Sequence, residues 1–145
     1  MTLLNHRIRR KHFSMPIYKV WETPGAAVPP PNERVLKVIL SPEVTGTKEL
    51  TLLVSIIRPC STTGVHTHDQ DETMYVATGI GEMLEGERRA WVQPDMVLVA
   101  PAGVSHEVKN TGDETLKLIC FFSPPLKSGG AYEKAIEAAK AHHHK

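Results

Sequence analysis

Two histidines and a glutamate lie close together in residues 64–72, "GVHTHDQDE". In a β-strand, residues i and i+2 point to the same face and lie about 7 Å apart. His66 and His68 would therefore present two imidazoles side by side. That separation suits a shared metal ion with nitrogen ligands at about 2.1 Å, so the spacing predicts that both histidines bind one metal.

Glu72 joins the same ion only if the chain turns after His68. In a continuing strand its carboxylate would lie about 13 Å further along. The intervening "DQD" is typical of a turn, because Asp side chains hydrogen-bond nearby backbone groups. We expect the chain to re-enter as a strand with Glu72, Met74 and Val76 facing inward and the residues between them facing outward.

A third histidine follows a second turn in residues 101–110, "PAGVSHEVKN". Pro101 and Gly103 predict a tight turn, His106 begins the next strand facing inward, and Asn110 ends it. Three imidazoles and one carboxylate suit one divalent transition metal (Fe, Mn, Ni, Co or Zn), among which the sequence does not choose. The alternative is a buried hydrogen-bonded network without metal.

Short strands surround these residues. The chain has 145 residues, 41% hydrophobic and 23% charged, which is typical of one globular domain. Turn-forming residues recur between apolar runs, which favours an all-β sandwich or barrel. We predict strands at residues 34–40, 49–57, 64–68, 72–79, 81–86, 89–93, 96–101, 106–110 and 115–122.

The two ends of the chain differ from this pattern. Residues 23–33, "TPGAAVPPPNE", are too Pro-rich for a helix or a central strand and predict an extended arm. Residues 129–143 carry apolar side chains at helical spacing and predict an amphipathic helix. We expect residues 1–34 to form an N-terminal arm and strand, 35–126 the barrel, and 127–145 a helix and tail.

Charge and cysteine content limit the function classes. The 17 Lys and Arg balance 16 Asp and Glu, which argues against a nucleic-acid partner. The basic residues 6–12 and the terminal "HHHK" are local exceptions, expected to be solvated ends. Cys60 and Cys120 are too few for a disulfide framework. With no apolar run long enough for a membrane helix, we expect a soluble cytoplasmic protein without a membrane partner.

Together the two motifs resemble those of the cupins, G-x5-H-x-H-x3,4-E-x6-G and G-x5-P-x-G-x2-H-x3-N. His66, His68, Glu72 and Gly79 fit the first motif at its spacing. The second is matched by the following residues: Pro101, Gly103, His106 and Asn110. The resemblance covers roughly residues 50–122. It departs at the first glycine of each motif, which is replaced by Cys60 and by Asp95; both positions lie in turns, and the ligand set is untouched.

The resemblance implies an RmlC-like double-stranded β-helix, a jelly-roll barrel with one metal near its wider end. It also implies a homodimer in which an N-terminal strand adds to the partner's sheet edge, and a catalytic role for Glu72 as a base. The expected function is metal-dependent chemistry on a small oxygenated substrate, of dioxygenase, decarboxylase or lyase type. Two alternatives stay open: a non-catalytic cupin that binds a sugar or organic acid, and a sugar isomerase or epimerase.

Other side chains are weaker candidates for the pocket. Leu116, Leu118, Cys120 and Phe122 share one face of the last strand and should line the barrel, with Cys120 a small core residue rather than a nucleophile. Met74, Met83 and Trp91 are expected in the core or the pocket wall. A further set could donate a proton, bind a carboxylate or make surface contacts: Tyr18, Tyr75, Arg34 and Arg58. A sugar isomerase or epimerase would need a basic clamp for a phosphate or carboxylate, for which the candidates are Arg34, Lys37 and Arg58.

Overall fold

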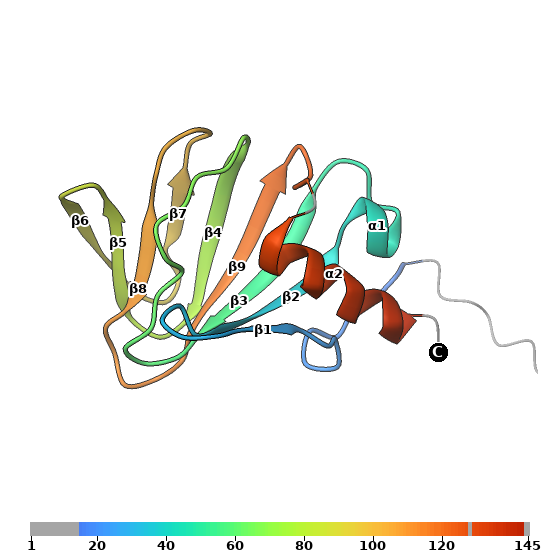
Figure 1. Ribbon diagram of the computed structural model, residues 1–145, viewed down its shortest axis with the longest axis horizontal. Helices are drawn as coiled ribbons and strands as arrows, with labels where there is room; N and C mark the ends of the chain where they lie inside the picture. Colours follow the sequence, from blue (N-terminus) through green and yellow to red (C-terminus); the bar gives the residue numbers. More distant parts are fainter. Residues whose placement is uncertain (1–14, 128, 144–145) are drawn as a thin grey trace, which may run out of the picture.

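Two antiparallel sheets dominate the computed structural model, which describes residues 15–127 and 129–143. Within them, the larger sheet has the order β1–β2–β3–β9–β4–β7 and the smaller the order β6–β5–β8 (Figure 1). The strands and helices are β1 (Ala26–Val28), β2 (Arg34–Leu40), α1 (Pro42–Thr45), β3 (Thr51–Ile57), β4 (Asp71–Thr78), β5 (Gly81–Glu85), β6 (Arg88–Val92), β7 (Val97–Ala100), β8 (Glu107–Asn110), β9 (Leu116–Ser123) and α2 (Gly130–His143). This two-sheet arrangement confirms the expected all-β barrel with a C-terminal helix.

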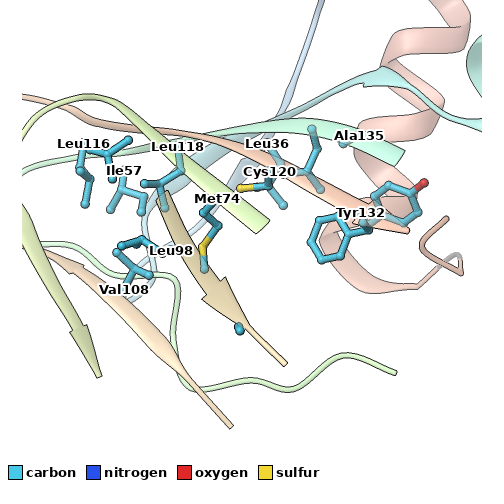
Figure 2. Packing of buried hydrophobic residues seen from close by; sticks show 14 of the residues in the cluster. Leu36, Ile57, Met74, Leu98, Val108, Leu116, Leu118, Cys120, Tyr132 and Ala135 are labelled. Carbon is cyan, nitrogen blue, oxygen red and sulfur yellow. The ribbon is translucent and has the colours of Figure 1, made fainter. Parts of the chain in front are cut away.

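On β4 and β9, the inner face of the larger sheet is built by alternation. On β4, the side chains of Glu72, Met74 and Val76 are buried. On β9, every second residue from Leu116 to Phe122 is buried as well. Because residues i and i+2 share a face, these rows line one interior surface. Figure 2 shows part of this cluster, including Leu118, Met74 and Cys120.

Helix α2 covers the end of the larger sheet that lies away from β4 and β7. It packs against β1, β2 and the short helix α1, at the end of the molecule opposite the three-stranded sheet (Figure 1). Tyr132, Ala135, Ile136 and Ala139 are its buried residues, at the helical spacing expected from the sequence. The helix therefore forms a wall of the interior rather than an appendage.

The N-terminal arm is only partly extended. Residues 26–28 form β1, which pairs with β2 so that Ala26 lies opposite Leu36. An edge position of this kind suits a strand followed directly by prolines. The basic residues 6–12 and the last two residues of the tail lie outside the described residues. No helix among the described residues is long and apolar enough to cross a membrane.

The predicted strand at residues 64–68 is wrong. This segment makes one isolated bridge, between His66 and His106. The reason is local: Gly64 has φ 73°, which strand residues do not adopt, and its N–H is bonded to the side chain of Thr62 at 3.0 Å. The two histidines therefore cannot owe their relative placement to strand alternation.

Both replaced motif glycines keep the backbone conformation that glycine favours. Cys60 has φ 63° and Asp95 has φ 71°, and they are the non-glycine residues with positive φ in the described chain. Asp tolerates this region, and its Oδ1 accepts a 2.8 Å hydrogen bond from the Tyr75 hydroxyl. The exposed Cys60 retains the steric cost of a Cβ in this region.

Replacing Cys60 with glycine should stabilise the fold. Removal of the Cβ relieves the left-handed strain, partly offset by the greater freedom of glycine in the unfolded chain, for a net gain of up to about 1 kcal/mol. Urea unfolding measures this difference. Cys60→Ala is the matched control, because it removes the thiol and keeps the Cβ, and it should give no comparable gain. Equal stabilisation by both substitutions would contradict the strain argument.

Candidate metal centre

Four side chains from separate parts of the chain converge on one point inside the barrel. His66 and His68 come from the loop before β4, Glu72 is the second residue of β4, and His106 directly precedes β8. The atoms that these residues offer as ligands lie within 4.8 Å of one another. Glu72 Oε2 lies 3.9, 3.4 and 2.9 Å from the Nε2 atoms of His66, His68 and His106, respectively.

Backbone hydrogen bonds hold the two segments together. His66 and His106 exchange a pair of backbone bonds, of 3.0 and 2.9 Å. The N–H of Gly103 donates to the carbonyl of His68 at 2.8 Å. These bonds, rather than a continuous strand, place the histidines opposite one another, and the ring centroids of His66 and His106 lie 4.4 Å apart.

The orientation of the imidazoles is also fixed. His66 Nδ1 lies 2.8 Å from the carbonyl oxygen of Gly64, and His106 Nδ1 lies 2.9 Å from that of Val104. A carbonyl oxygen only accepts, so each Nδ1 donates and each Nε2 faces the cluster. The ring of His68 packs edge-on against Phe122, with centroids 4.9 Å apart. Such outer contacts are what metal-binding histidines use to keep one nitrogen available.

The electrostatics favour an ionised carboxylate. Glu72 is 5% exposed, and its burial raises its pKa. Hydrogen bonds from His106 and His68, together with the charges of these imidazoles, outweigh that effect and lower the pKa of Glu72 to about 2. Burial lowers the pKa of His66. At His106 burial also acts to lower the pKa, but the bond to Glu72, the bond to the carbonyl of Val104 and the charge of Glu72 together outweigh it and raise the pKa.

The donor set fits a divalent transition metal. Two ligand atoms bound to one such ion at about 2.1 Å lie roughly 3.0–3.4 Å apart at tetrahedral or octahedral angles. The separations of 2.9, 3.4 and 3.9 Å from Glu72 Oε2 lie near this range. Small side-chain adjustments would bring all four groups onto one ion. The structure thus assembles a three-histidine, one-glutamate candidate metal site, and whether an ion binds there stays a prediction.

A cavity of about 240 Å³ opens beside this cluster. Most of its wall is apolar and comes from the inner face of the larger sheet and from α2. The three expected pocket residues Met74, Cys120 and Phe122 line it. The remaining lining residues are Arg34, Leu36, Leu53, Ser55, Thr63, His66, His68, Glu72, His106, Val108, Leu118, Leu126, Ala131 and Tyr132.

One of three expectations about single apolar residues is wrong. Trp91 is 54% exposed on β6, so its assignment to the core or the pocket wall is wrong. Met83 packs against the core but does not line the cavity. Cys120 is fully buried, and burial raises the pKa of its thiol well above the ordinary value, as expected of a core residue rather than a nucleophile.

Of the candidate proton donors and carboxylate binders, only Arg34 lines the cavity. Arg58 pairs on the surface with Glu33 at 3.0 Å. Lys37 donates to the carbonyl of Val20. The hydroxyl of Tyr75 donates a hydrogen bond to Asp95, and Tyr18 lies on the arm and does not line the cavity.

Ser55 and Tyr132 are among the cavity residues that the sequence analysis missed. Ser55 lies on β3 between Leu53 and Ile57 and faces inward with them. A hydroxyl flanked by apolar side chains in the inward row was the signal that could have identified it. Tyr132 was expected on the buried face of the helix, but nothing in the sequence indicated that this face closes the cavity.

Comparison with known proteins identifies the family. Residues 53–122 match the cupin domain family. A predicted oxalate decarboxylase from Thermotoga maritima superposes with a TM-score of 0.68 at 20% identity, covering 75% of this chain and 99% of that one. KdgF from a Halomonas species superposes with a TM-score of 0.63 at 21% identity, covering 75% and 94%.

A third structure, an RmlC-like cupin protein from Desulfovibrio desulfuricans, gives a TM-score of 0.56 at 20% identity, covering 64% of this chain and 84% of that one. None of the curated proteins matches the sequence significantly. At such low identities the structural matches establish the fold alone. The fold, the family match and the two histidine motifs agree, and residues 53–122 of the chain form a cupin domain.

Proposed function

We propose that this protein is a metal-dependent cupin enzyme acting on a small oxygenated organic substrate. The observation that carries the proposal is the convergence of His66, His68, Glu72 and His106 at the wall of a largely apolar cavity. Most ligand pockets combine apolar walls with a few well-placed polar groups in this way. The volume of about 240 Å³ lies below the range for drug-sized ligands, which favours a small substrate.

Each part of the cavity has a distinct task in this proposal. The three imidazoles and Glu72 hold the metal, which when bound supplies Lewis acidity toward substrate oxygens. Leu36, Leu53 and Phe122 exclude water from the same space. A low dielectric around the substrate strengthens every electrostatic contact that it makes.

Glu72 suits the role of ligand better than that of base. A carboxylate with a pKa of about 2 binds protons weakly near neutral pH. Its Oε2 also lies within 4 Å of all three imidazoles, as a shared ligand position requires. The catalytic role suggested by family resemblance remains a prediction, and it requires a change in the surroundings of the carboxylate.

The named relatives favour decarboxylase-like chemistry among the possible reactions, since one is a predicted oxalate decarboxylase. A non-catalytic binder of a sugar or organic acid is the second candidate. It is favoured by the absence of a free acid among the lining residues, where the Tyr132 hydroxyl is hydrogen-bonded to Thr51 at 3.3 Å. A sugar isomerase is less favoured, because Arg34 alone of the three candidate clamp residues lines the cavity.

Metal binding should stabilise the fold. An ion that binds only the folded barrel adds about 2.7 kcal/mol at one hundred times its dissociation constant. Dialysis against a chelator should lower the melting temperature, and one equivalent of the native metal should restore it. His66→Ala or His106→Ala should abolish the response, because each removes a ligand.

The terminal histidines need a control of their own. Replacing His142, His143 and His144 together with alanine removes any ion bound by the tail and leaves the cavity intact. This variant should keep the full thermal response. If the response disappears with the tail and survives His106→Ala, the cavity is not the metal site.

Turnover separates the functional alternatives. Elemental analysis of the purified protein, joined to a metabolite screen with and without oxygen, should reveal consumption of a small oxygenated acid or sugar. Iron with oxygen-dependent turnover selects a dioxygenase, whereas manganese or zinc with oxygen-independent turnover selects a decarboxylase, lyase or isomerase. Tight ligand binding without turnover under any metal would select the binding protein instead.

We also propose that the protein is a homodimer. Tyr75, Val97, Val99 and Phe121 are partly exposed on the outer face of neighbouring strands β4, β7 and β9. The arm exposes further apolar side chains, among them Ile17 and Trp21 at 75% and 77%. Exchange of arms between two copies would cover both surfaces, and neighbouring exposed apolar groups commonly mark such contacts.

Light scattering at micromolar concentration should therefore give the mass of a dimer. Val99→Lys places a charge within the outer apolar face and should shift the mass toward that of a monomer. Lys109→Ala, on the smaller sheet, is the control and should leave the dimer unchanged. A monomeric mass for the unsubstituted protein would remove this claim.

A further inference from the structure

Arg34 holds a fixed position in the cavity wall. It is the first residue of β2 and lies opposite Ile57 on β3, which makes Ser55 its diagonal neighbour on the inner face. One guanidinium nitrogen donates to the carbonyls of Thr63 at 2.6 Å and Thr62 at 3.4 Å. These carbonyls belong to the loop that carries His66, so the guanidinium and the metal ligands are positioned by the same segment.

Two polar atoms at this wall lack a partner. Arg34 Nε and Ser55 Oγ are buried and make no hydrogen bond with any described residue. Ser55 as a whole is only 3% exposed. A buried donor or acceptor without a partner costs about 1–3 kcal/mol, and native proteins contain few of them. Both residues line the same cavity, which indicates that a ligand in the cavity completes their bonding.

The charge of the cavity specifies the ligand further. Among the described lining residues, Arg34 and Glu72 are those that carry a full charge with histidines neutral. Arg34 makes no ion pair within the described chain, and burial lowers the pKa of its guanidinium. A divalent metal would more than balance Glu72, leaving a net positive cavity that favours an anion.

Resting on the proposed metal-dependent function, we propose that the cavity binds a small dicarboxylate. One carboxylate pairs with the guanidinium of Arg34 and the hydroxyl of Ser55, and the other faces His66, His68, Glu72 and His106. The planar guanidinium matches a carboxylate in geometry, which a lysine at this position would not. Arg34 lies outside the cupin match at residues 53–122, so substrate choice comes in part from a residue that the family match does not include.

Calorimetric titration with malonate tests this proposal. The protein is loaded with zinc, the tail histidines are replaced as above, and ionic strength is matched with sodium chloride. Malonate should bind more tightly than acetate, and the neutral malonamide should not bind measurably. Arg34→Gln should weaken malonate binding by about tenfold to a hundredfold. Arg58→Gln, at an exposed arginine, should leave it unchanged.

Ser55→Ala is the second variant, since Arg34→Gln also alters contacts to the histidine loop. It should weaken malonate binding without lowering the melting temperature of the ligand-free protein, because a buried hydroxyl without a partner destabilises the ligand-free fold. Zinc content is measured for every variant. Malonate binding equal in the parent and in both zinc-loaded variants, or no tighter than that of acetate, would overturn the carboxylate site.

Measurements on the metal-free protein distinguish the proposed metal-dependent function from the proposed anion site. Malonate should still raise its melting temperature, more weakly than with zinc, and only when Arg34 is present. A chain that binds no zinc but shows this Arg34-dependent shift would refute the metal function and retain the anion site. A chain that binds zinc in the cavity without any Arg34-dependent malonate binding would refute the anion site and retain the metal site.

Discussion

The pair of backbone hydrogen bonds between His66 and His106 is the constraint on which the site depends. His66 lies in no strand, and His106 only precedes one, so neither is fixed by a sheet. Their mutual bonds, supported by the bond from Gly103 to the carbonyl of His68, join the two halves of the ligand set. Each bond contributes only about 1 kcal/mol net, but together they bring three imidazoles around one carboxylate. Glu72 then needs only its inward position on β4 to complete the cluster.

Much of this arrangement could be predicted from the sequence because it follows local rules. Alternation on β4 and β9 placed Glu72, Met74 and Cys120 on the inner face, and the buried rows confirm it. The strand prediction for residues 64–68 was wrong, because it assumed alternation where the chain turns at Gly64. The prediction that Trp91 lies in the core or the pocket wall was wrong for another reason. Nearly all of β6 is exposed, because it is an edge strand of the small sheet, and an aromatic residue in a strand pattern does not show which strands are edges.

The walls of the cavity were harder to predict than its metal ligands. The ligands lie within residues 53–122, where spacing along the chain encodes their roles. Arg34 comes from β2 and Tyr132 from α2, and their approach to the site depends on packing between distant segments. In our account, the two parts of the chain have different tasks. The cupin segment supplies the metal ligands, and the flanking elements β2 and α2 shape the space in which a substrate would bind. The left-handed backbone at Cys60 and Asp95 shows the same segment keeping its turns even where glycine has been replaced.

The most direct test of the central claim is X-ray absorption spectroscopy of the metal-loaded protein whose tail histidines have been replaced. Our account predicts one ion per chain with three imidazole nitrogens and one carboxylate oxygen at about 2.1 Å. His106→Ala should remove one imidazole from that spectrum or abolish binding. A coordination sphere of water and carboxylate oxygens alone, or a spectrum unaffected by His106→Ala, would contradict it.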